Sequence, residues 1–172
     1  VLVGHAGVFE VSTVKKLTVD SSSRWSSFSS GKGASSTHAS TLLKKLLEDV
    51  VKQHLLADVP VACFLSSGLD SGILAALACR ENIGAISTFT VALPGSPHDE
   101  SIRARQMAEH CGSRHHELVI HTDQALLWVE SALTALDSPT ADAINTYIIS
   151  KAVANHGIKV ALSGLGADEL FG

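Results

Sequence analysis

The sequence predicts an α/β fold, a doubly wound parallel sheet with helices on both faces. Two observations carry this prediction: four short runs are apolar throughout, and segments with a helical pattern separate them. Strands of a parallel sheet are covered on both faces, so they lack the polar alternation of a half-exposed strand. The chain has 172 residues, of which 45% are hydrophobic and 17% are charged, which fits one globular domain.

The segment before this pattern divides in two. Residues 1–19 read VLVGHAGVFEVSTVKKLTV, with short β-like runs broken by Gly4 and Gly7, and we expect a hairpin or the tail of a preceding domain. Residues 20–36 read DSSSRWSSFSSGKGASS. A stretch so rich in serine and glycine buries little surface, so it predicts a linker.

The domain itself is expected over residues 37–172, beginning with an amphipathic helix at 41–56. Leucines and valines recur there at helical spacing, with lysines and acidic residues on the opposite side, and we expect the apolar stripe to pack in the core. After it, strands are expected at 59–65, 85–93, 115–121 and 158–164, and helices at 71–81, 99–111, 123–136 and 142–156. A sheet of this kind binds ligands beyond the carboxyl ends of its strands.

Composition narrows the class of protein. The formal net charge of −4 gives no reason to expect a nucleic-acid surface. The sequence holds no apolar run of about 18 residues and no basic segment followed by an apolar core, so we expect a cytoplasmic protein with no membrane partner. Cys63, Cys79 and Cys111 are far apart and odd in number, which predicts buried or half-buried free thiols. The nine histidines lack the spacing of a transition-metal site.

Both ends of the sequence lack the usual signs of a complete chain. It begins at Val1 without a methionine and stops at Gly172 within an unfinished helix or loop. We therefore expect a fragment, truncated at its carboxyl end and inactive by itself.

The turn after the first strand is unusual in composition. It reads FLSSGLDSG over residues 64–72, with Ser66, Ser67, Gly68 and Ser71 between an apolar run and a helical pattern. Small residues allow a tight turn, and the following helix directs unpaired N–H groups toward it. This environment suits an anion, above all phosphate. The lysine and spacing of the Walker-type loop are absent, and so is G-x-G-x-x-G.

Two aspartates add a metal to this hypothesis. Asp70 would repel a phosphate unless a cation lay between them, and Mg²⁺ binds carboxylates together with phosphate oxygens. Asp168 lies in SGLGADE (163–169), after the fourth strand, and supplies a second carboxylate at the same edge of the sheet. The alternative is that each aspartate only caps a helix.

Several motifs resemble one family. L-S-S-G-L-D-S (65–71) is similar to the S-G-G-L-D-S loop of PP-loop ATP pyrophosphatases, and residues 41–172 resemble the synthetase domain of glutamine-dependent asparagine synthetases. GHAG (4–7) resembles the hairpin that ends the glutaminase domain of that family. The supporting motifs, in order, are ADVPVACFLSSGLDS (57–71), FTVALPGSPHDE (89–100), HHE (115–117), NTYIISKA (145–152) and VALSGLGADELFG (160–172).

The resemblance implies a fold of the adenine nucleotide alpha-hydrolase type and a two-step reaction. Mg-ATP adenylates a carboxylate, aspartate in the family, with loss of pyrophosphate, and ammonia from a glutaminase domain then forms the amide. Whether the protein is a homodimer stays open. By the same resemblance Ser66, Ser67, Gly68 and Ser71 hold pyrophosphate, Asp70 and Asp168 hold Mg²⁺, and the backbone of Leu65, Val91, Ser163 and Gly164 contacts adenosine.

Three departures from the family pattern leave the product open. Ser67 replaces a loop glycine, Leu165 stands where asparagine-forming members carry a glutamate, and SPTADAIN (138–145) lacks the arginine of T-T-I-R. The alternatives are an amidotransferase acting on another carboxylate, a nucleotide-binding module without catalysis, or another PP-loop ligase such as an NAD or GMP synthetase or a tRNA-modifying thiolase. Lys151 is expected to be a solvated surface residue, and His116 with Glu117 to have a structural role.

Overall fold

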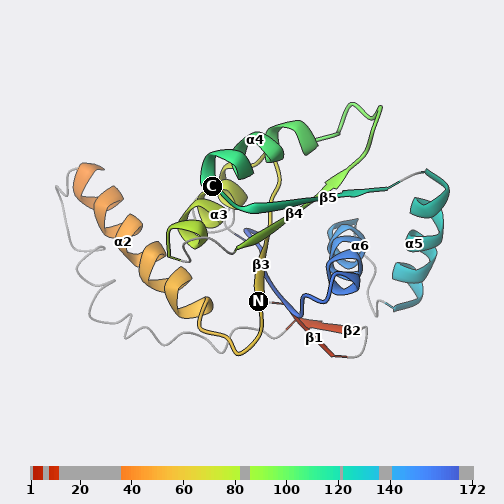
Figure 1. Cartoon of the computed structure of the whole chain (residues 1–172), viewed down its shortest axis with the longest axis horizontal. Coiled ribbons are helices and arrows are strands. Elements are labelled where there is room, and N and C mark those ends of the chain that lie inside the picture. The colour runs from red at the N-terminus through yellow and green to blue at the C-terminus, as the bar shows by residue number, and fades with distance from the viewer. Residues whose placement is uncertain are drawn as a thin grey trace.

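The computed structural model describes residues 2–5, 8–11, 36–81, 86–120, 122–135 and 141–166. Strands and helices alternate from the third element onward, except that two helices follow one another before the last strand, as the sequence predicts (Figure 1). The elements are β1 (Leu2–His5), β2 (Val8–Val11), α2 (Ser36–His54), β3 (Val61–Phe64), α3 (Leu69–Glu81), β4 (Ser87–Ala92), α4 (Ser101–Cys111), β5 (Arg114–Val119), α5 (Thr122–Ala135), α6 (Ala141–Asn155) and β6 (Val160–Leu162).

One six-stranded sheet holds the described strands in the order β2-β1-β6-β3-β4-β5. The four strands β6, β3, β4 and β5 are parallel, which confirms the predicted parallel sheet. The hairpin strand β1 pairs antiparallel with both β2 and β6, so it extends this sheet. That residues 1–19 form the tail of a preceding domain stays a prediction.

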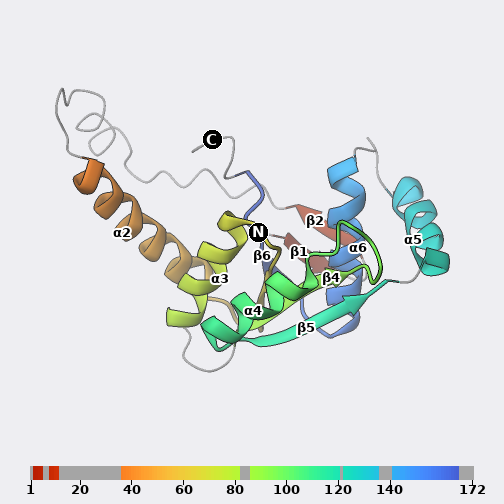
Figure 2. The ribbon, with the colours of Figure 1, turned by 90° about the horizontal axis from the view of Figure 1, so that it is seen from above.

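Helices cover both faces of the sheet, as expected. On one face Val51 of α2, Ala75 of α3 and Ala104 of α4 pack with Cys63 and Leu162 of the strands. On the other face the next residues along the strands, such as Phe64, pack against α6 and Trp128 of α5. Figure 2 shows the two groups of helices on opposite sides. The alternating direction of strand side chains therefore divides the core into two layers.

The first helix is longer than its sequence pattern predicts. It begins at Ser36, the last residue of the predicted linker, and not at the expected start, Thr41. Leu47 and Val51 pack in the core as expected, whereas Leu42 is 43% exposed. The apolar stripe is therefore a core element only in the carboxyl-terminal half of α2, while residues 20–35 lie outside the described residues.

The order of the strands creates one reversal. The chain runs outward from β3 through β4 to β5, then returns through α5 and α6 to place β6 on the other side of β3. The loops that follow β3 and β6 therefore lie on either side of this reversal. The expected position of a ligand is the crevice between these two loops.

Two further expectations can be compared with the structure. Cys63 is buried and Cys79 and Cys111 are half-buried, and all three are free thiols, as predicted. None of the helices within the described ranges is both long and apolar enough to cross a membrane.

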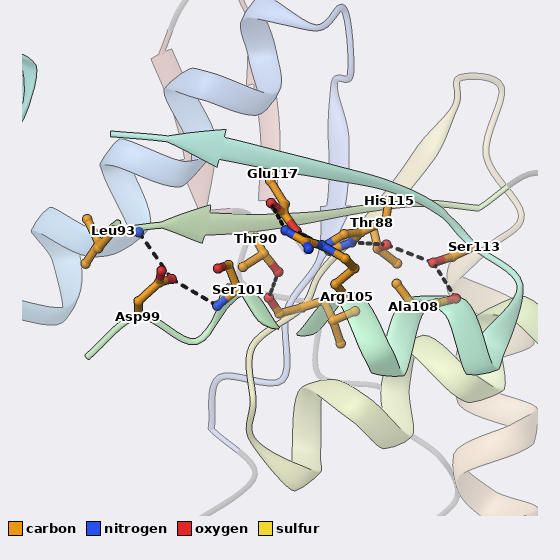
Figure 3. Close-up of polar contacts among 11 residues, drawn as sticks. Thr88, Thr90, Leu93, Asp99, Ser101, Arg105, Ala108, Ser113, His115 and Glu117 are labelled. Carbon is orange, nitrogen blue, oxygen red and sulfur yellow. Dashed lines mark hydrogen bonds and ion pairs between the residues drawn. The ribbon is translucent and has the colours of Figure 1, made fainter. Parts of the chain in front are cut away.

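Polar contacts hold α4 against the edge strand β5 (Figure 3). Arg105 of α4 donates from Nε and Nη2 to the two carboxylate oxygens of Glu117, at 2.6 and 2.7 Å. The buried Thr88 hydroxyl lies 3.0 Å from His115 Nδ1 and 2.9 Å from Ser113 Oγ. These contacts give Glu117 the structural role expected for it.

The two neighbouring histidines of β5 point to opposite faces of the sheet. His115 lies beside Glu117, whereas the His116 ring stacks on Phe89 with centroids 4.7 Å apart and faces His156. Burial lowers the pKa of His115, and burial and His156 lower the pKa of His116. Both imidazoles are therefore neutral in the folded protein at neutral pH.

These histidines predict how stability depends on pH. Their pKa values in the folded state lie below the unfolded value of about 6.5, so between the two values the unfolded chain binds more protons. Their contribution to stability is complete above about pH 6.5 and is lost as the pH falls through the folded pKa values. Urea unfolding measured from about pH 7.5 to about pH 5 should show this loss.

A histidine substitution tests which group is responsible. His115→Gln should flatten the fall in unfolding free energy at acidic pH, whereas His110→Gln, on the exposed side of α4, should leave the slope unchanged. An unaltered slope in His115→Gln would show that this imidazole does not control acid stability.

Candidate active site

A cleft of about 930 Å³ lies at the carboxyl ends of β3, β4 and β6. It occupies the reversal between β3 and β6, where an open α/β sheet binds ligands. Of the residues that the sequence assigned to nucleotide binding, the cleft wall contains all but Ser67. They are Leu65, Ser66, Gly68, Asp70, Ser71, Val91, Ser163 and Gly164.

The loop after β3 is held in shape by two serine hydroxyls. Ser71 Oγ accepts a hydrogen bond from Ser66 N at 3.1 Å and donates to the Gly68 carbonyl at 3.1 Å. Ser66 Oγ lies 2.8 Å from Ser71 Oγ and accepts from Gly68 N at 3.1 Å. These hydroxyls thus bond within the loop itself, and unpaired N–H groups of the first turn of α3 are the donors that a helix end leaves available.

The loop after β6 touches the beginning of α3. A β-carbon built on Gly164 would lie 3.0 Å from Ser71 N and 3.2 Å from the carbonyl carbon of Asp70. Both of these neighbours are backbone atoms, so a side chain here would force the backbone to shift by a few tenths of an ångström. Glycine at 164 therefore lets the two loops meet without this shift.

A buried threonine fixes the start of the first loop. Thr90 of β4 is 2% exposed, and its hydroxyl donates to the Leu65 carbonyl. Leu65 N in turn donates to the Phe89 carbonyl at 2.9 Å. Sequence reasoning did not select Thr90, although a hydroxyl within the apolar run FTVAL was a visible signal.

Two acidic residues before α4 were also not selected as site residues. Asp99 Oδ1 accepts hydrogen bonds from Ser101 N at 3.1 Å and from Leu93 N at 3.3 Å (Figure 3). The bonds from Ser101 and Leu93 hold the pKa of Asp99 below its usual value. Glu100 instead lines the cleft, and its Oε2 accepts from Ser67 N at 3.1 Å. Their motif, PHDE (97–100), resembles the family, but its residue types alone do not predict these contacts.

The cleft wall is acidic. Asp70 and Glu100 line it, and none of the described residues in the wall is a lysine or an arginine. An anionic ligand would therefore need a cation to offset these carboxylates. Carboxylate oxygens are ligands that suit Mg²⁺.

The structure describes only one of the two predicted metal ligands. Asp70 is in the first turn of α3, past the cap position, and it borders the cleft. Asp168 lies outside the described residues, so its approach to Asp70 stays a prediction.

Other predicted features lie on or near α6. Leu165, in the position of the family glutamate, is 73% exposed and lines the cleft, as do Asn145 and Thr146 of α6. The prediction of a solvated Lys151 is wrong. Its half-buried ammonium donates to Ser131 Oγ at 3.1 Å and lies 5.5 Å from the Tyr147 ring centroid, because α5 packs against α6 at this point.

The family model and the curated relatives agree on one family for most of the chain. The asparagine synthase family model matches residues 42–172. Asparagine synthetase B from Escherichia coli K12 is 33% identical over 147 residues, covering 76% of this chain and 26% of that protein. A putative asparagine synthetase from Mycobacterium bovis is 40% identical over 129 residues, covering 74% and 20%. The matched part thus spans about a quarter of the first relative's length and a fifth of the second's.

Among solved structures, an NH3-dependent NAD synthetase from Campylobacter jejuni matches with a TM-score of 0.49 at 13% identity. The match covers 72% of this chain and 54% of that one.

A glycine substitution tests the contact between the two loops. Gly164→Ala should lower the free energy of unfolding by about 1–3 kcal/mol, because its β-carbon must push backbone away. Gly72→Ala is the matched control. Gly72 is buried beside the loop, and its β-carbon would meet only Met107, at 3.5 Å or more.

Because Gly72 is helical, its replacement by alanine should leave stability unchanged or raise it by up to about 1 kcal/mol. Urea denaturation of both variants provides the measurement. Equal stability of Gly164→Ala and the parent protein would mean that the loops can separate without cost.

Proposed function

We propose, since this chain belongs to the asparagine synthase family, that it forms the nucleotide-binding part of an ATP-dependent amide-forming ligase. The protein would adenylate a carboxylate with release of pyrophosphate and then form the amide with ammonia. One observation carries the proposal: Gly164 packs against Asp70 and Ser71, so the loops after two parallel strands form one cleft at the amino end of α3.

The pyrophosphate part of the nucleotide is assigned to the loop after β3. Ser66, Gly68 and Ser71 bind to one another and keep the first turn of α3 open toward the cleft. Ser67 N–H and the N–H groups of that turn are the proposed donors to phosphate oxygens. Because these donors are held in a fixed orientation, they would stabilise the negative charge that develops on the leaving pyrophosphate.

Asp70 and Asp168 are the proposed ligands of Mg²⁺, which when bound neutralises phosphate charge. Asp70 fits this role because it borders the cleft beside the anion-binding turn. Its carboxylate would hold the cation between itself and the phosphates, which offsets the acidity of the wall.

The adenosine is assigned to the neighbouring strand ends. Leu65, Val91, Ser163 and Gly164 border the same cleft. Both backbone polar groups of Leu65 are hydrogen-bonded. Its N–H donates to the Phe89 carbonyl, and its carbonyl accepts from the Thr90 hydroxyl. Backbone groups held in this way can position a base and ribose with little loss of entropy on binding.

The acceptor is proposed as a carboxylate, with aspartate as the family substrate and another carboxylate as the alternative. No arginine or lysine occurs among the described wall residues, which favours an acceptor without a second free carboxylate. Ammonia from a glutaminase domain, a cytoplasmic location and a possible homodimer belong to the same proposal.

A second candidate function is a nucleotide-binding module without catalysis. The observation that favours it is Leu165, a hydrocarbon side chain 73% exposed beside the cleft, where the family carries a glutamate. A leucine cannot accept a proton from ammonia or from an intermediate. This candidate differs from the first in one measurable way, since it binds Mg-ATP and forms no product.

The proposed reaction predicts pyrophosphate and AMP as products. The intact protein, given Mg-ATP, ammonia and a panel of carboxylates, should release pyrophosphate only with its own acceptor. Asp70→Asn should reduce this rate by about a hundredfold, the usual scale for losing one preorganised charge contact. Asp58→Asn, an exposed residue before β3, is the matched control and should retain the parent rate.

The products of the reaction distinguish the two candidate functions. Release of ADP and phosphate would contradict adenylation. Binding of Mg-ATP by calorimetry, without product from any acceptor, would support the module without catalysis.

A further inference from the structure

Glu100 makes a contact that its own helix does not require. It occupies the cap position of α4, yet its side chain makes no capping hydrogen bond there. The Ser101 N–H at this helix end is bound instead by Asp99, at 3.1 Å. Glu100 Oε2 turns to the loop after β3 and accepts from Ser67 N, 33 residues earlier in the chain.

This contact places a carboxylate where a phosphate is expected. Ser67 N–H belongs to the turn assigned to pyrophosphate, and it is the one N–H of that turn to which the structure gives an anionic partner. One N–H group cannot donate fully to a carboxylate and to a phosphate oxygen at the same time. A bound phosphate at Ser67 therefore has to displace Glu100.

The charge around the contact makes this displacement depend on the ligand. Asp70 borders the same cleft, and the described wall residues include no lysine or arginine that would offset the two carboxylates. A polyphosphate without metal meets this repulsion with its full charge. A polyphosphate that carries a divalent cation arrives with less charge and brings an attraction for both carboxylates.

We propose that Glu100 is a specificity-determining residue, which restricts the loop after β3 to metal-complexed phosphates and rejects metal-free ones. The inference rests on the proposed function, because it assumes that this loop binds pyrophosphate. Glu100 lies on the exposed rim of the cleft, so water and salt weaken its repulsion. The effect on binding is therefore moderate and decreases with ionic strength.

The test compares the binding of inorganic pyrophosphate to the intact protein with excess Mg²⁺ and with a chelator, by calorimetry. Glu100→Gln keeps the size of the side chain and an oxygen that can accept from Ser67, but removes the charge. It should tighten metal-free pyrophosphate binding by roughly threefold to tenfold, the range for one partly screened charge. Binding of the magnesium complex should change less, so the ratio of the two affinities falls.

Glu109→Gln is the matched control, since Glu109 is an exposed glutamate of the same helix. Its ratio of metal-dependent to metal-free affinity should equal that of the parent protein. If the ratio in Glu100→Gln also equals the parent value while Mg-pyrophosphate binds, Glu100 does not select the ligand and only this inference fails. If no variant binds Mg-pyrophosphate, the proposed function itself is wrong and the inference falls with it.

Discussion

The site depends on the close approach of Gly164 to the amino end of α3. With no β-carbon at this position, the loop after β6 rests on the backbone of Asp70 and Ser71. The two loops come from neighbouring strands at the reversal of the sheet, so the contact joins the two halves of the α/β fold. Within the described residues, the groups assigned to the phosphates lie beside this contact, and Val91 borders the same cleft from the neighbouring strand β4.

The serine-rich loop shows how a rigid site can be built from small polar residues. Ser66 and Ser71 direct their hydrogen bonds toward each other and toward Gly68, so the loop is fixed before a ligand arrives. Such preorganisation lowers the entropy that binding would otherwise cost. The hydroxyls thus act on a ligand through the backbone that they shape.

Local pattern was enough to predict the strands, the helices and the loop residues. Apolar runs and helical spacing are properties of short segments, so each element was found within a few residues, apart from the start of α2. Glu100 and Lys151 were not understood from sequence because their partners, Ser67 and Ser131, are distant in the chain. Whether a lysine side chain is buried, and which way a glutamate carboxylate points, depend on how two elements pack together. The sequence of one segment does not show this packing.

The short strand β6 connects the amino-terminal hairpin with the cleft. Its three residues pair with β3 on one side and with β1 on the other, through Leu2 opposite Ala161 and Val3 opposite Val160. Gly164 follows only two residues after the strand ends. A strand this short has little stiffness of its own, so its position is set by both neighbours. A displacement of β1 would therefore pass along β6 into the loop that touches α3, which gives β1 and β2 a mechanical route to the cleft.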